Sequence, residues 1–137
     1  MFLPERLRLL HDDFMVFDDP HERLNAVLDR SRPTPALPAS QRIDANRVPG
    51  CVSVVWLVGE RHGAVCRFRS DAESALVRGL VAFVCEFFTD APAAEIANYL
   101  LDPLAELGLT KHLSPTRKNG LAAVQTAIRA YAQAQTA

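Results

Sequence analysis

Apolar side chains recur at helical spacing in the first part of the chain. Four of them lie on one face of a helix predicted over residues 4–17: Leu7, Leu10, Phe14 and Phe17. A second helix is predicted to begin after Asp19, whose side chain suits an N-cap, with Pro20 at the first helical position. Pro33 ends this helix, because proline cannot continue the backbone hydrogen bonds. Residues 31–40 contain three prolines and are predicted to be an extended connector.

The pattern changes to that of a β-hairpin between residues 51 and 69. Residues 51–58 are rich in β-branched and aromatic side chains and follow the turn-forming pair Pro49-Gly50. Residues 59–63 are predicted to form a loop, and residues 64–69 a second strand in which basic and apolar side chains alternate. An isolated hairpin is marginal in water, so a third strand or packed helices are expected.

The remainder of the chain is predicted to be helical. The longest apolar stretch, residues 72–88, is expected to be the central buried helix, with Ser70 and Glu73 at capping-box spacing. Two short helices and a final helix over residues 114–134 follow. Helices and strands are thus segregated along the chain. This order predicts an α+β fold with a small antiparallel sheet of two to three strands packed against several helices.

Length and composition favour one ordinary globular domain over residues 1–137. The chain has 49% hydrophobic and 23% charged residues, which argues against a disordered protein. The formal net charge of −1 gives no indication of a nucleic-acid partner or of attraction to anionic lipid. No apolar run approaches the roughly 20 residues that span a bilayer, and the N-terminus lacks the features of a secretory signal. A cytoplasmic location is therefore expected.

Three cysteines are the candidates for chemistry, and their odd number argues against a disulfide framework. Their spacing and that of the four histidines predict no metal site. Cys85 lies among apolar residues of the central helix, and Cys66 shares a strand face with Phe68, so both are expected in the core. Cys51 follows a Pro-Gly turn, where glycine allows close approach of another molecule. Its position alone leaves open whether it is a structural or a reactive thiol.

Arg117 is the second unusual feature. It lies in the first turn of the helix that Ser114 is expected to cap, with Lys111 and Lys118 nearby, and cations there oppose the helix macrodipole. Two interpretations remain open: an exposed side chain that bends into solvent, or a basic corner that faces an anion. A thiolate or persulfide would be such an anion, because a nearby cation favours the thiolate. His112 could contribute to this corner or be an ordinary surface residue of the turn.

Three segments resemble the SufE family, which comprises SufE and its paralogue CsdE. Residues 46–57, with Cys51 directly after the Pro-Gly turn, are similar to the family's active-cysteine segment. Residues 71–80 are similar to its Asp-Ser-Asp-Ala-x-Ile-Val-x-Gly-Leu stretch, and residues 107–121 match its C-terminal signature. The segments occur in the family's order and spacing, and the resemblance covers nearly the whole chain. It implies a SufE/NifU-like fold.

The resemblance also implies a function in sulfur transfer. It implies that the chain accepts sulfane sulfur from a PLP-dependent cysteine desulfurase (SufS- or CsdA-like), stimulates it, and passes the sulfur to an iron–sulfur scaffold such as a SufBCD-like complex. By position, Cys51 would be the persulfide acceptor, and Arg117 would stabilise the sulfur anion or help docking. The partner-binding surface would include four further residues: Gly50, Val52, Glu73 and His112. No cofactor is implied, since the PLP belongs to the partner, so the chain would be an accessory carrier rather than a stand-alone enzyme.

The chain departs from the family at three positions near the expected site. Val52 and Val54 stand where glutamine is common, which makes this edge of the sheet more apolar. Glu73 replaces an aspartate, which keeps the charge and lengthens the side chain. These differences leave the thiol in place and bear on the shelter of Cys51 and on affinity for the partner.

Two other functional classes remain. A thiol-based redox enzyme or peroxide sensor would need an exposed thiol with a resolving partner, for which Cys66 and Cys85 are poorly placed. A non-catalytic interaction module would make Cys51 dispensable. Rapid peroxide consumption would favour the first class, and an unchanged desulfurase assay after alkylation of Cys51 would favour the second.

Overall fold

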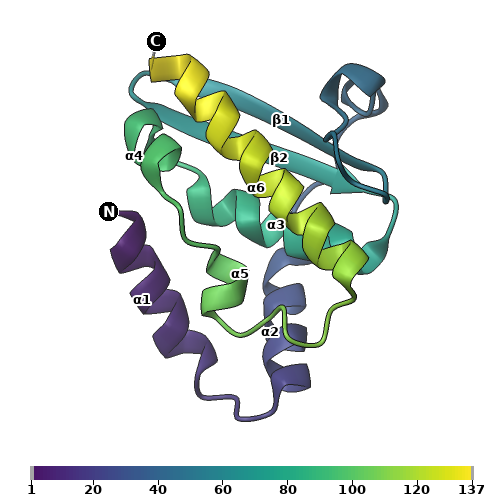
Figure 1. Cartoon of the computed structure of the whole chain (residues 1–137), viewed down its shortest axis with the longest axis vertical. Helices are drawn as coiled ribbons and strands as arrows, with labels where there is room; N and C mark the ends of the chain where they lie inside the picture. The colour runs from purple at the N-terminus through teal and green to yellow at the C-terminus, as the bar shows by residue number, and fades with distance from the viewer. Residues whose placement is uncertain (1, 137) are drawn as a thin grey trace.

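A computed structural model describes residues 2–136 of the chain. Two helices precede a hairpin, and the rest of the chain is mainly helical, as Figure 1 shows. The elements follow in this order: α1 (Leu3–Phe14), α2 (Pro20–Ser31), the 3-10 turns η1 (Ala39–Gln41) and η2 (Asp44–Asn46), β1 (Val55–His62), β2 (Val65–Ala72), α3 (Ala75–Phe88), β3 (Ala91–Pro92), α4 (Ala93–Asn98), α5 (Pro103–Glu106) and α6 (Pro115–Thr136).

The hairpin confirms the antiparallel pairing and corrects the strand bounds. The first strand was predicted to begin at Cys51, but pairing begins at Val55, opposite Ala72, and continues to His62 opposite Val65. The predicted loop over residues 59–63 is therefore mostly strand, and only Gly63-Ala64 form the turn. Gly63 has a φ of +63°, which glycine adopts at little cost. Residues 51–54 form a loop instead of a strand because they have no partner in β2.

A third strand completes the sheet. Ala91 and Pro92 of β3 pair antiparallel with Cys66 and Val65, which gives the order β1-β2-β3. The predicted α+β fold with a sheet of two to three strands and several packed helices is confirmed.

The start of α3 differs from its prediction. Ser70 was expected to cap this helix, but residues 70–72 continue β2, because they pair with the first residues of β1. The cap is Ser74, whose hydroxyl accepts a hydrogen bond from the N–H of Val77 at 3.5 Å. The prediction at α2 is confirmed, since Asp19 accepts from the N–H of His21 at 2.9 Å.

Helices α3 and α6 cover one face of the sheet, and α6 runs roughly along the strands in Figure 1. Phe68 of β2 lies on this face, with its ring centroid 5.6 Å from that of Tyr131 in α6. Its N–H donates to the Thr89 hydroxyl at the end of α3, at 3.1 Å. Gly59 lies opposite Phe68 in the register, and a Cβ there would lie 2.8 Å from the Tyr131 ring. Glycine at this position therefore allows α6 to approach the sheet closely.

The opposite face of the sheet is charged and exposed to solvent, as the alternation of basic and apolar side chains in β2 predicted. Arg69 pairs with Glu60 at 2.9 Å, and Arg67 pairs with Asp90 at 2.7 Å. Within residues 2–136, no helix is both long and apolar enough to cross a membrane.

Candidate functional site

Cys51 lies in a loop whose two ends are held together. Arg47 and Trp56 form an antiparallel bridge, and the N–H of Val48 donates to the carbonyl of Val55 at 2.9 Å. Val48 and Val55 are both buried in the core. The base of the loop is therefore fixed, and the residues between Val48 and Val55 project from it.

The loop packs along one side of α6. Gly50 has a φ of +84°, and a Cβ there would lie 3.6 Å from the Cβ of Ala123. The Cys51 thiol donates a hydrogen bond to the carbonyl oxygen of Gly120, with 3.2 Å between sulfur and oxygen. Gly120 and Ala123 are three residues apart, so they are neighbours on the helix surface. Gly50 thus supplies a backbone conformation that brings the thiol against α6.

The resting thiol is half-buried and protonated. Burial raises the pKa of the Cys51 thiol above its ordinary value, and the charge of the Arg47 guanidinium opposes this shift. A protonated thiol is also what the hydrogen bond to Gly120 requires, because a thiolate has no proton to donate. The resting position therefore shelters the sulfur and keeps it poorly reactive.

Arg47 is the basic residue at the base of this loop, and Arg117, the basic residue predicted for the site, lies in α6. Arg117 lies in the first turn of α6, where its N–H donates to the Ser114 hydroxyl at 3.2 Å, and its side chain is exposed. It precedes Gly120 by three residues in α6, whereas the charge that acts on the pKa of Cys51 is that of Arg47. Arg47 was not foreseen as a site residue, although it lies only four positions before Cys51. The bridge with Trp56 holds Arg47 at the base of the Cys51 loop, and the sequence does not reveal this bridge.

The residues expected on the partner-binding surface fall into two places. Val52 is 80% exposed at the tip of the loop. Glu73 is exposed beside the far end of the loop, since its N–H donates to the carbonyl of Val54 at 3.2 Å. His112 lies against His21 of α2, with the two imidazole rings stacked 5.5 Å apart. The structure therefore brings Val52 and Glu73 to the Cys51 loop, and it shows a contact of His112 that the sequence did not indicate.

The other two thiols are in the core, as predicted. Cys66 is 0% and Cys85 3% exposed, and burial raises the pKa of Cys85 to about 12. Within the described part of the chain, no three His, Cys, Asp or Glu side chains come together as metal ligands.

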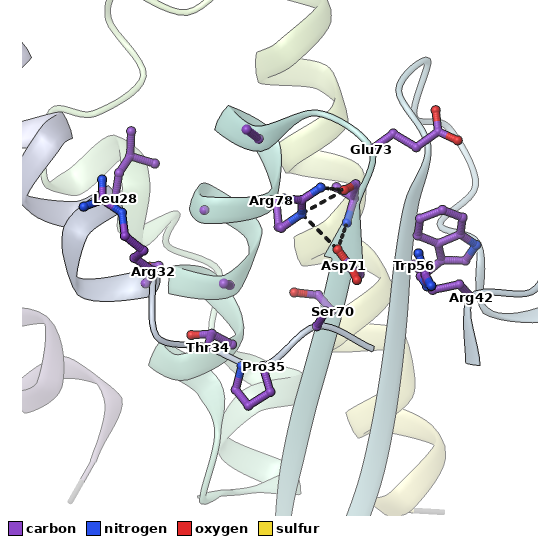
Figure 2. Close-up of a pocket in the computed structure, with 16 residues that line it drawn as sticks. Leu28, Arg32, Thr34, Pro35, Arg42, Trp56, Ser70, Asp71, Glu73 and Arg78 are labelled. Carbon is purple, nitrogen blue, oxygen red and sulfur yellow. Dashed lines mark hydrogen bonds and ion pairs between the residues drawn. The ribbon is translucent and has the colours of Figure 1, made fainter. Parts of the chain in front are cut away.

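A groove of about 810 Å³ opens beside the loop, between the connector that follows α2, the ends of β1 and β2, and the start of α3 (Figure 2). Trp56 and Glu73 belong both to this groove and to the flanks of the Cys51 loop. The groove was not foreseen, because its walls are distant in sequence.

Asp71 organises the wall of the groove. It is 4% exposed, and its carboxylate accepts hydrogen bonds from the N–H groups of Leu37 and Ala72, at 3.2 and 2.8 Å. Arg78 of α3 donates to the same carboxylate at 3.0 Å and also to the carbonyl of Ala72 (Figure 2). Asp71 therefore ties the connector, β2 and α3 together.

Comparisons with known proteins identify the family. The family model SufE, described as an Fe-S metabolism associated domain, matches residues 8–132. An uncharacterised SufE-like protein of Rhizobium etli is 35% identical over 131 residues, covering 92% of this chain and 88% of the relative. A second from Rhizobium meliloti is 35% identical over 127 residues, covering 89% and 91%.

A solved structure has the same fold. The solution structure of a hypothetical protein from Thermus thermophilus superposes with a TM-score of 0.77 at 18% identity, over 100% of both chains. This likeness concerns the fold alone. The family match and the two relatives decide the assignment: this chain belongs to the SufE family and to iron–sulfur metabolism.

Proposed function

We propose that Cys51 accepts sulfane sulfur as a persulfide from a PLP-dependent cysteine desulfurase, that the chain stimulates this partner, and that it passes the sulfur on for iron–sulfur cluster assembly. The observation that carries the proposal is the position of Cys51. It is the half-buried thiol of a projecting loop, beside an exposed apolar tip, in a chain whose other two cysteines are in the core.

The transfer follows the chemistry of thiol–disulfide exchange. The Cys51 thiol loses its proton to solvent or to a base of the partner, and the thiolate attacks the outer sulfur of the donor persulfide. The bond between the two donor sulfurs breaks, and the donor cysteine leaves as a thiolate. Cys51 then carries the persulfide, with no external oxidant or reductant. A second exchange of the same kind delivers the sulfur to a scaffold.

The loop must leave its resting position for this reaction. In the resting state the sulfur is a donor to Gly120, and burial keeps its pKa high. The attacking form is the thiolate, which has no proton for that hydrogen bond. Water and the positive charge of Arg47 stabilise this anion. Because the base of the loop is anchored at Val48 and Val55, only the residues between them need to move. Shelter at rest would limit oxidation of the thiol.

A redox enzyme with a resolving cysteine fits the chain less well. Cys66 and Cys85 are buried, so neither could reach a sulfenic acid on Cys51 without unfolding of the core.

The test is stimulation of a PLP-dependent cysteine desulfurase from the same organism, measured as alanine released from cysteine. The wild-type chain should stimulate alanine release. A Cys51→Ser variant, which keeps the loop's size and fold, should bind the desulfurase without stimulating it. Equal stimulation by the variant would contradict the proposal and would favour an interaction module.

A further inference from the structure

The groove beside the Cys51 loop contains cationic groups with unused hydrogen-bond donors. Arg42 follows η1 and lies next to Trp56 in Figure 2. Its guanidinium makes no hydrogen bond or ion pair with any of residues 2–136. Arg78 donates through Nε and Nη2, whereas its Nη1 has no acceptor among these residues. Donors of this kind suit carboxylates, which guanidinium groups bind in a fork-like geometry.

A buried hydroxyl gives an independent indication of a binding site. Ser70 of β2 is 7% exposed, and its Oγ has no hydrogen-bond partner of ordinary geometry in the described chain. Figure 2 shows this hydroxyl pointing from β2 into the groove, toward the connector at Thr34 and Pro35. The Cys85 thiol of α3 is within reach of a hydrogen bond from it, but a thiol sulfur is a weak acceptor. Buried hydroxyls are usually satisfied, so one on a groove wall whose neighbour is only a weak acceptor suggests a missing ligand.

The size of the groove suits a ligand. Its volume of about 810 Å³ lies within the range of roughly 300–1,000 Å³ of ligand pockets. The α3 wall presents the small residues Ala75 and Ala82, whereas the space above Gly79 is filled by the Leu28 side chain. Trp56 offers an aromatic surface at the end that adjoins the Cys51 loop.

We propose that this groove binds an acidic polypeptide segment of the sulfur-donor protein, with carboxylates of that segment held by Arg42 and Arg78. The inference rests on the proposed function, because Trp56 and Glu73 line the groove and also flank the Cys51 loop on which the sulfur donor acts. Asp71 does not oppose it, since its carboxylate is buried, is paired with Arg78 and accepts hydrogen bonds from two backbone N–H groups. Glu73 repels an acidic group placed directly beside it, so the acidic residues of the segment lie against Arg42 and Arg78 instead.

A polyanion such as a nucleic acid fits less well. Its phosphates would be spaced along the whole groove and would meet Glu73, and the chain has a net charge of −1. A protein segment can instead alternate acidic and neutral residues to match the groove.

The single tryptophan provides a direct probe of docking. The chain is labelled with 5-fluorotryptophan, which places one fluorine at Trp56, and is titrated with unlabelled cysteine desulfurase from the same organism. Arg42→Glu should raise the desulfurase concentration at half-saturation at least about tenfold, because like charges then face each other. Arg42→Lys should keep most of the affinity. Arg8→Glu, the same charge change on α1 outside the groove, should have no effect.

Two further readouts separate this inference from the proposed function. Docking of the wild type should weaken between about 50 and 300 mM salt, and this dependence should be smaller for Arg42→Glu. Alkylation of Cys51 by iodoacetamide should proceed equally in the wild type and in Arg42→Glu, since the groove acts on docking and not on the thiol. If the desulfurase transfers sulfur but Arg42→Glu docks like Arg8→Glu, the groove proposal is wrong. If no sulfur reaches Cys51 in the wild type, the proposed function is wrong.

Discussion

At the scale of single residues, two effects act in opposite directions on the pKa of the Cys51 thiol. Burial against α6 raises its pKa and favours the protonated thiol, which the hydrogen bond to Gly120 also requires. Arg47 lowers the pKa and favours the thiolate. A sheltered, protonated sulfur at rest and a nearby cation for the reactive state are both useful to a carrier that reacts only beside its partner.

Removal of the Arg47 charge should shift the reactivity of Cys51 to higher pH. Arg47 lowers the pKa of the thiol, so Arg47→Gln should raise it, and less thiolate should be present at a given pH. The measurement is the pH profile of the iodoacetamide reaction, monitored by mass spectrometry. Arg47→Lys keeps the charge and should restore most of the wild-type profile. A profile unchanged in Arg47→Gln would show that this guanidinium does not act on the sulfur.

At the scale of elements, the site depends on two close contacts that hold the connector and α6 against the sheet. One is Asp71, which joins the connector to β2 and α3. The other is Gly59 of β1, which lets Tyr131 of α6 lie on the strand. Asp71 fixes a wall of the groove, and the Gly59 contact holds α6, against which the Cys51 loop packs.

Loss of the Asp71 charge should destabilise the fold. Asp71→Asn weakens the acceptor of three hydrogen bonds at a buried position and should lower the free energy of unfolding by about 1–3 kcal/mol. Asp90→Asn is the control, because the Arg67–Asp90 pair is exposed and should contribute less than about 1 kcal/mol. Urea denaturation of both variants measures the difference. Similar losses in the two variants would contradict the anchoring role of Asp71.

Addition of a methyl group at Gly59 should also be costly. Its Cβ would lie 2.8 Å from the Tyr131 ring, so Gly59→Ala should lower stability by about 1–3 kcal/mol through overpacking. The double variant Gly59→Ala/Tyr131→Ala should lose less than the sum of the two single variants, because the clash is absent. Additive losses in thermal or urea unfolding would indicate that the strand, and not the ring, is disturbed.

At the scale of the whole molecule, the sheet is covered by helices on one face and charged on the other, and the Cys51 loop projects from one end of β1. The groove opens at the same end, because Trp56 and Glu73 line the groove and also flank the Cys51 loop. A partner that docks at this end would contact the thiol and the groove together. The remaining two thiols are enclosed by the core and take no part.

Much of this organisation could be predicted from the sequence where the signal is local. The N-cap at Asp19, the apolar helix α3 and the core positions of Cys66 and Cys85 follow from residue type and spacing. The strand bounds could not be predicted, because residues 51–54, with two valines, look like a strand and only the register with β2 excludes them. Arg47 and the groove were missed for the same reason, since both depend on contacts between distant segments.

The most direct measurement of the central claim is the intact mass of the chain after incubation with cysteine desulfurase and cysteine, compared for the wild type and Cys51→Ser. The wild type should gain one sulfur atom, which a thiol reductant removes, and Cys51→Ser should gain none. Circular dichroism and docking should be the same for both, so that loss of uptake reflects the thiol. Addition of one sulfur to Cys51→Ser, or none to the wild type, would contradict the assignment of Cys51 as the persulfide acceptor.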